Sequence, residues 1–151
     1  MGGTLDFTSI HKLTDSALRI SESSAWMFAL SKREIQQEII RMNQEQLYEH
    51  GIDSLGKTLG DYRPLTIEIK RKKGERYDHV TLFDEGDFYA SFRVEYGEDW
   101  FEVIGNDMAG NYDRPLFEIY GENVMGLTEF NLERMKPLIL KYYAQYVSNI
   151  F

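Results

Sequence analysis

The C-terminal segment, residues 126–151, constrains the fold most, because its apolar side chains repeat with the period of an α-helix. They recur at i, i+3, i+4 and i+7 and so form one continuous face, which must pack against another element. We predict a helix over about residues 129–149, kinked or delayed at Pro137, which has no backbone donor. The stripe comprises Met135, Leu138, Ile139, Tyr142, Tyr143, Tyr146, Val147 and Ile150.

A second helix is predicted over about residues 32–50. The stretch SKRE, Ser31 to Glu34, has the pattern of a capping box, in which the Ser and Glu side chains bind free backbone N–H groups reciprocally. Gly51 offers the left-handed conformation that ends many helices. One face of this helix carries apolar residues at Ile35, Ile39, Met42 and Leu47.

The N-terminal region, residues 1–30, is less clear. Residues 4–20 have roughly helical spacing, the Ser-rich stretch SESS breaks the pattern, and SAWMFAL is compatible with a short helix or a buried turn. We predict an N-terminal arm or helix over residues 1–30, which could fold only on a neighbouring molecule. Residues 31–151 are predicted to form a single domain.

Residues 51–91 mix loops with short apolar segments. Three Gly and one Pro predict a long loop over residues 51–64. The following LTIEIKRKKG, residues 65–74, fits a strand and a short helix about equally well. HVTLFD, residues 79–84, is predicted to be a strand, and DFYAS, residues 87–91, a helical turn.

Two alternating segments, SFRVEYG and DWFEVIG, flank Gly97-Glu98-Asp99 and predict a β-hairpin with a turn of about two or three residues. LFEIYG, residues 116–121, is predicted to be a short strand or a turn. Helices therefore flank a small antiparallel sheet, and the fold class is predicted to be α+β, with the sheet packed on the two long helices.

The composition excludes several kinds of site. The hydrophobic content of 42% is that of a folded protein, and the absence of Cys excludes disulfides, thiolate nucleophiles and Cys-ligated zinc. The three His residues have no metal-ligand spacing, and no apolar run reaches the length of a membrane span. We expect a soluble protein made inside a cell, with no metal, no cofactor and no membrane partner.

The charge is unevenly distributed along a chain of net charge −8. Residues 70–76, KRKKGER, contain five basic residues and one acidic residue, whereas residues 84–107 contain eight acidic residues and one basic residue. These segments are compatible with two solvated surfaces. They are also compatible with head-to-tail contacts between copies of the chain, in which opposite charges meet.

The acidic turn DEGD, residues 84–87, has three possible roles. A calcium loop needs acidic residues at alternate positions and a distant bidentate Glu, a pattern that is not met. A glycosidase could pair Asp84 or Glu85 with Glu102, but nothing in the sequence marks a substrate cleft. We prefer a structural turn and expect no catalytic residue.

In this structural interpretation, Asp84 accepts hydrogen bonds from the free N–H groups of the next helical turn, and Gly86 gives the bend its backbone freedom. Phe88 and Phe92, four residues apart, face the core. Ser91, at the end of this segment, is the third residue to which we assign a structural role in the turn, after Asp84 and Gly86.

The order of these segments, together with several short local motifs, resembles a family of tailed-bacteriophage neck proteins, also called tail-completion, head–tail joining or virion morphogenesis proteins. Family members have a long helix, a Gly-rich loop, a basic segment ending in Gly, a strand with a D-T-G-type turn, a hairpin, an E-F-G turn and a terminal helix. The likeness covers about residues 32–150. The corresponding motifs here are residues 51–66, Lys70 to Gly74, Asp84 to Ser91, Glu118 to Gly121 and Gly126 to Glu129.

The resemblance implies a non-enzymatic structural protein of the virion, made in the host cytoplasm. It would form a closed homo-oligomeric ring of roughly six- or twelve-fold symmetry at the head–tail junction. The ring would join portal or adaptor proteins to tail proteins, with passing contact to genomic DNA.

Two functions from other classes remain open: a small carboxylate-dependent enzyme, and a monomeric acidic inhibitor or binding module. The basic run could meet DNA phosphates or an acidic protein surface, and we favour the protein surface because DNA must slide through a neck. The candidate interface residues are Asp53, Asp61, Tyr62, Lys70, Arg71, Lys72, Lys73, Tyr142, Tyr143 and Tyr146.

Overall fold

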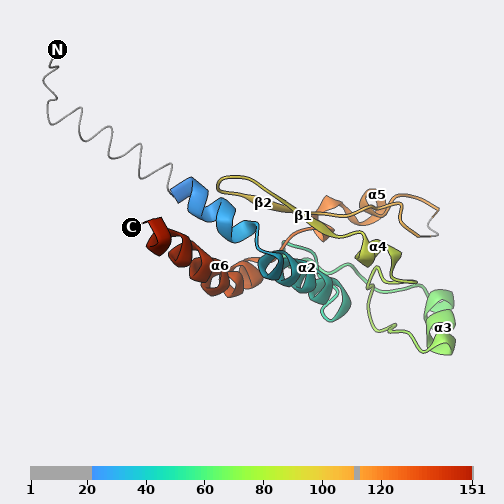
Figure 1. Ribbon diagram of the computed structural model, residues 1–151. Helices are drawn as coiled ribbons and strands as arrows, with labels where there is room; N and C mark the ends of the chain where they lie inside the picture. Colours follow the sequence, from blue (N-terminus) through green and yellow to red (C-terminus); the bar gives the residue numbers. More distant parts are fainter. Residues whose placement is uncertain (1–21, 111–112, 151) are drawn as a thin grey trace, which may run out of the picture.

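The computed structural model describes residues 22–110 and 113–150 and has the predicted α+β fold (Figure 1). After a helix over residues 22–30, the elements are α2 (Arg33–Tyr48), α3 (Pro64–Lys73), α4 (Asp87–Ala90), β1 (Arg93–Tyr96), β2 (Phe101–Ile104), α5 (Leu116–Tyr120), the 3-10 helix η1 (Glu122–Val124) and α6 (Glu129–Ile150).

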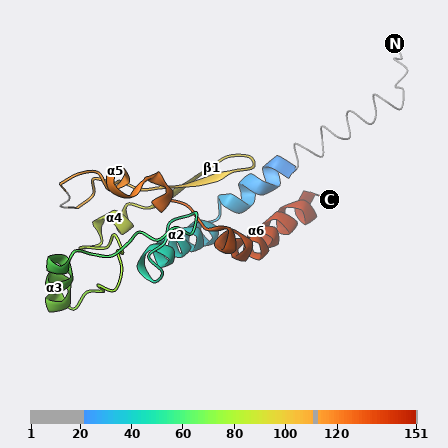
Figure 2. The ribbon, with the colours of Figure 1, turned by 180° about the vertical axis from the view of Figure 1, so that it is seen from behind.

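The described part of the chain is elongated. Helices α2 and α6 contact each other, and the hairpin of β1 and β2 packs against α2. Helix α3 projects at one end of the molecule, whereas the helix over residues 22–30 and the C-terminal half of α6 lie at the other end (Figures 1 and 2). Both ends therefore present surface far from the central core.

The core forms where α2, α4, the hairpin and the start of α6 meet. Ile35 and Ile39 of α2 are fully buried, as the helical stripe predicts, and Met135 of α6 is buried beside them. Phe88 and Phe92 are also buried, with their ring centroids 4.9 Å apart in an edge-to-face arrangement. The prediction that these two rings face the core is confirmed.

Helix α2 also buries two amide side chains that the apolar pattern does not identify. Asn43 is fully buried, and its Nδ2 donates to the carbonyl of Val124 at 2.9 Å. Its Oδ1 accepts from the backbone N–H of Gly126 at 2.8 Å. One side chain of α2 therefore binds both a donor and an acceptor of the segment that leads into α6.

Gln46 extends this network one turn further along α2. Its Nε2 donates to the carbonyl of Gly126 at 2.9 Å, and its Oε1 accepts from the N–H of Thr128 at 2.8 Å and from Nδ2 of Asn131 at 2.7 Å. Buried polar groups are costly unless they are paired. Gln46 and Asn43 therefore fix where residues 124–131 run across α2, and with them the start of α6.

Residues 65–74, which fit a strand or a helix, form the helix α3. Pro64 stands at its first turn, where a missing N–H costs nothing, and Gly74 ends it in the left-handed conformation. Helix α6 is confirmed over nearly the predicted range and continues through Pro137, so the predicted delay is wrong.

Two short segments differ from their predictions. Residues 79–84 do not form a strand: the N–H of Val80 bonds the carbonyl of Gly60, the N–H of Thr81 bonds the Tyr62 hydroxyl, and Leu82 has a φ of 56°. The backbone N–H groups of Val80 and Thr81 therefore bond to groups of the preceding loop and not to a neighbouring strand. Residues 116–120, predicted as strand or turn, form helix α5.

The predicted capping box is wrong. Helix α2 begins after Lys32 with no side-chain cap. The Ser31 hydroxyl instead donates to the carbonyl of Phe28 at 2.7 Å and so satisfies the end of the preceding helix. The Glu34 carboxylate accepts a hydrogen bond from the Tyr142 hydroxyl of α6. Both side chains therefore bind groups of neighbouring helices and not the free N–H groups of α2. The local sequence does not indicate these contacts.

The N-terminal prediction is tested only in part, because residues 1–21 lie outside the described residues. Residues 22–24 of the SESS stretch are helical, so the predicted break does not occur there, and SAWMFAL is helix. Trp26 packs on Tyr143 and Phe28 on Tyr146, with ring centroids 4.7 and 5.2 Å apart. The helix over residues 22–30 is therefore held along α6.

The hairpin has the predicted turn. Strands β1 and β2 are antiparallel, and the N–H of Gly97 bonds the carbonyl of Trp100, which leaves Glu98 and Asp99 at the tip. Among the described residues the sheet has these two strands. Val94 faces Val103 on the inner side of the ribbon, where Val103 is buried.

We expect Gln46→Leu to destabilise the protein by at least about 2 kcal/mol, because it leaves the buried N–H of Thr128 and the carbonyl of Gly126 without partners. Gln37→Leu, an exposed position on the same helix, is the matched control and should change stability by less than about 0.5 kcal/mol. Urea unfolding measures both, and equal stabilities of the two variants would contradict the structural role of the amides.

Candidate functional site

The basic run does not present four equivalent cations to solvent. Lys70 is 8% exposed and turns inward, where its Nζ donates to the carbonyl of Phe83 at 3.0 Å and pairs with Glu75 at 3.2 Å. The ammonium also lies 4.9 Å from the ring centroid of Tyr62. Lys70, predicted as an interface residue, is therefore not free for a partner in this structure, because this side chain anchors α3 to the rest of the fold.

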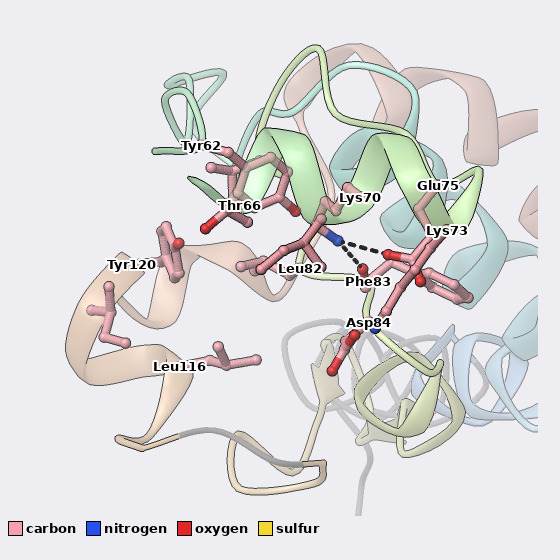
Figure 3. Close-up of a pocket in the computed structure, with 13 residues that line it drawn as sticks. Tyr62, Thr66, Lys70, Lys73, Glu75, Leu82, Phe83, Asp84, Leu116 and Tyr120 are labelled. Carbon is pink, nitrogen blue, oxygen red and sulfur yellow. Dashed lines mark hydrogen bonds and ion pairs between the residues drawn. The ribbon is translucent and has the colours of Figure 1, made fainter. Parts of the chain in front are cut away.

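A cleft of about 300 Å³ lies beside this anchor, between α3, residues 80–84 and α5 (Figure 3). Figure 3 shows the Lys70 ammonium joined to Glu75 and to the Phe83 carbonyl, with Leu116 and Tyr120 across the cleft. Burial raises the pKa of the Tyr120 hydroxyl, and the nearby Tyr62 adds to this shift. The lining is mostly apolar, which suits a hydrophobic side chain better than a charged substrate.

The other basic residues of α3 remain at the surface. Arg71 lies over the ring of Tyr77 at 5.0 Å, and Lys72 and Lys73 are exposed. Neither Lys72 nor Lys73 forms an ion pair with any residue in the described parts of the chain. These two ammonium groups are the part of the basic run that is available to a partner.

The candidates in the loop over residues 51–64 have structural roles, with one exception. Asp53 is buried, and its Oδ1 accepts from the N–H groups of Leu55 and Lys57 at 2.9 Å each. The Tyr62 hydroxyl bonds the Thr81 side chain and accepts from the Thr81 N–H. Asp53 and Tyr62 are thus not free for a partner in this structure, whereas Asp61 is exposed.

Gly51 shows why this loop takes its course. Gly51 has a φ of 58°, and a Cβ there would lie 2.5 Å from Cδ2 of His79. The His79 Nε2 donates to the carbonyl of Tyr48 at 2.7 Å, at the end of α2. The His79 ring therefore packs directly on the Gly51 backbone, as only glycine allows.

The three tyrosines of α6 are half-buried within the chain. Tyr143 and Tyr146 pack on the aromatic rings of the helix over residues 22–30, and the Tyr142 hydroxyl donates to Glu34 of α2. Each ring already has an intramolecular contact. The three rings meet two different helices, so they spread over more than one side of α6.

The acidic turn is a bend, as predicted, but Asp84 does not cap the next helix. Gly86 has a φ of 91° and directly precedes α4, which has no side-chain cap. Asp84 instead lines the cleft beside α3. Ser91 closes the turn, because its hydroxyl donates to the carbonyl of Phe88 and accepts from the N–H of Asn106.

The acids that a glycosidase would pair lie on different surfaces: Asp84 lines the α3 cleft, whereas Glu102 lies on the hairpin beside another groove. Hydrogen bonds from Arg41 and Arg76 lower the pKa of Glu38 and of Asp78, and neither carboxyl lines the cleft. Within residues 22–110 and 113–150, no three His, Cys, Asp or Glu side chains cluster closely enough to hold a metal ion. None of the described helices is both long and apolar enough to cross a membrane.

Several large apolar side chains are exposed, and the sequence analysis missed them. Leu55 is 76% exposed, Leu65 70%, Ile69 47% and Trp100 51%. The spacing of Leu65 and Ile69, four residues apart after Pro64, is the sequence signal that could have identified an apolar face on α3. Exposed apolar side chains beside free charges are typical of interaction surfaces.

Comparisons of the chain with protein-family models, with curated proteins and with solved structures found no match. The function must therefore be argued from the surfaces just described and from the order of the sequence motifs.

We expect Lys70→Met to lower the stability by about 1–3 kcal/mol, because the Phe83 carbonyl and the Glu75 carboxylate lose their shared cation. The loss should concentrate in α3, where amide hydrogen exchange should accelerate more than in α2. Lys72→Met, at an exposed position of the same helix, is the matched control and should leave exchange in α3 unchanged. Equal behaviour of the two variants would remove the anchoring role of Lys70.

The contact between Tyr142 and Glu34 predicts a pH dependence. The Glu34 carboxylate raises the pKa of the Tyr142 hydroxyl, chiefly by accepting its hydrogen bond. This contact therefore stabilises the fold below the ordinary tyrosine pKa of about 10 and loses its effect as pH rises through the raised value. Glu34→Gln should lower the pKa of Tyr142, followed by NMR of ring-labelled tyrosine with Tyr142→Phe as the assignment. Glu133→Gln, an exposed acid on α6, should leave this pKa unchanged.

Proposed function

We propose that this protein is a structural component of a tailed-phage virion that forms a ring at the head–tail junction. In this role it joins portal-side proteins to the tail, with roughly six- or twelve-fold symmetry set by the neck axis. Its mechanism is geometric: faces of neighbouring subunits join the ring, and projecting loops and helices adapt one layer of the neck to the next.

The observation that carries the proposal is the order of the sequence motifs together with the elements they occupy. The Gly-rich segment forms a projecting loop and leads into α3, the basic run lies on α3, and the D-E-G-D turn leads into α4. The segment Gly126 to Glu129 opens α6. This order of long helix, loop, basic segment, hairpin and terminal helix is the one expected for the neck family.

A second observation supports assembly. The described part of the chain is elongated, with its exposed apolar side chains on separate elements: Leu65 and Ile69 on α3, Trp100 at the hairpin tip and Leu140 on α6. An elongated subunit with apolar surface on several sides can bury that surface against neighbouring copies on both sides. A protein that works as a free monomer has no such need.

The proposal is tested by the mass of the purified protein in solution and by electron microscopy of the same sample, together with its binding to isolated portal complexes. We expect closed rings with a central hole, or a monomer that assembles as a ring on the portal complex. A protein that remains monomeric and also fails to bind portal or tail complexes would contradict the neck role. It would favour the monomeric binding module or the small enzyme.

A further inference from the structure

The exposed face of α3 combines apolar and basic groups. Leu65, Ile69 and Lys72 follow one another at i, i+4 and i+7, so they share one side of the helix, and Lys73 lies beside Ile69. Leu65 and Ile69 are largely exposed, and the two lysines have no ion-pair partner among the described residues. Among the described residues, Glu68 lies at the margin of this α3 face, which is defined by Leu65, Ile69, Lys72 and Lys73. Ile69 and Lys73 also line the rim of the α3 cleft, where Glu75 and Asp84 are the acids.

A groove elsewhere on the molecule has the complementary chemistry. It has a volume of about 490 Å³ and lies between β2, η1 and the start of α6. Its apolar lining includes Trp100, Met125 and Leu132, of which Trp100 is 51% and Leu132 40% exposed. Of the described residues, three acids line the same groove, Asp99, Glu102 and Glu122, and no Lys or Arg does. We refer to it as the acidic groove.

The hairpin carries an unfavourable charge arrangement beside this groove. Glu95 of β1 lies directly opposite Glu102 of β2 in the antiparallel register, and both are exposed. Like charges directly opposite each other destabilise a strand pair. Glu95 is paired with Arg93 at 3.3 Å, whereas Glu102 has no ion pair within the described residues. A cation from outside the chain would relieve this repulsion.

The α3 face and the acidic groove cannot meet within one chain. Helix α3 projects at one end of the molecule, whereas the hairpin turn points toward the helix over residues 22–30 at the other end (Figures 1 and 2). Trp26 of that helix and Trp100 of the hairpin line a common pocket, which places the tip there. Complementary patches at separate places on one subunit are the arrangement that head-to-tail contacts between copies use.

We propose that α3 of one copy docks in the acidic groove of a second copy. Leu65 and Ile69 enter between Trp100, Met125 and Leu132, as an amphipathic helix enters an apolar groove. Lys72 and Lys73 then face Asp99, Glu102 and Glu122, which form no ion pair with any described residue of their own chain. This inference rests on the proposed ring, for which it names the surfaces that join neighbouring subunits.

Charge reversal tests the contact. The variants K72E/K73E and E102K/E122K should each raise the protein concentration needed for half-maximal assembly by about tenfold or more, because each places like charges across the interface. The combined variant K72E/K73E/E102K/E122K should recover assembly to within about threefold of the wild type, because coupling between contacting residues is what such a cycle measures. R33E/K136E, which reverses two exposed charges away from both surfaces, is the matched control.

Crosslinking gives a readout even where association in solution is weak. The chain has no cysteine, so any disulfide that forms must join the engineered thiols. A mixture of the K72C and E102C proteins should form a disulfide-linked dimer at least about tenfold faster than a mixture of R33C and E102C, because only the first pair is brought together. Equal rates for the two mixtures would overturn the proposal, as would a combined charge variant that assembles no better than either parent.

The same variants separate the remaining explanations. If K72E/K73E loses binding to double-stranded DNA while its assembly and crosslinking stay at wild-type levels, the α3 face is a DNA surface and the proposal fails. If the protein forms rings or binds portal complexes but K72C does not crosslink to E102C, the neck role stands and the α3–groove contact falls. If that crosslink forms in a protein that neither forms rings nor binds portal complexes, the contact stands and the neck role falls.

Discussion

The fold depends on two buried amides of α2. Asn43 and Gln46 bind four backbone groups of residues 124–128, and Gln46 also binds the Asn131 side chain. These hydrogen bonds fix the segment that leads into α6 at one position along α2. Apolar packing alone tolerates sliding between helices, because it has no direction, whereas hydrogen bonds have defined donors and acceptors. Gly126, whose N–H and carbonyl these amides bind, lines the groove beside Met125 and Leu132.

Helix α3 is held in a different way. Its main attachment is one buried ammonium, Lys70, assisted by the Tyr62 ring and by the Glu75 carboxylate. This attachment leaves Leu65, about 140° around the helix axis from Lys70, uncovered, whereas Ile69 is half-exposed at the rim of the cleft. The lysines of the basic run differ in burial because of helical geometry. Lys70 faces the protein, whereas Lys72 lies about 160° away around the helix axis and faces outward.

The sequence predicts the fold class, both long helices, the hairpin and its turn, because these depend on periodicity and on local turn residues. It does not predict features that depend on distant partners. Ser31 and Glu34 form a good local capping pattern, but Phe28 and Tyr142 bind them instead. In the sequence, Lys70 cannot be told apart from the other basic residues of the run. It differs from them because its ammonium binds the Phe83 carbonyl, which the sequence does not place nearby. Residues 79–84 have strand-like composition, but none of the described strands lies beside them, and tyrosine hydroxyls bind their backbone instead.

The two-stranded ribbon has a consequence for contacts between separate chains. Within the described residues both strands are edge strands, so each has backbone groups that a foreign strand could bind. Each strand is four residues long, and the outer side of the ribbon carries Glu95 directly opposite Glu102. Two such ribbons brought together edge to edge would align four carboxylates, which disfavours that pairing. The charges that we propose to bind α3 of a second copy would thus also disfavour edge-to-edge pairing of hairpins between chains.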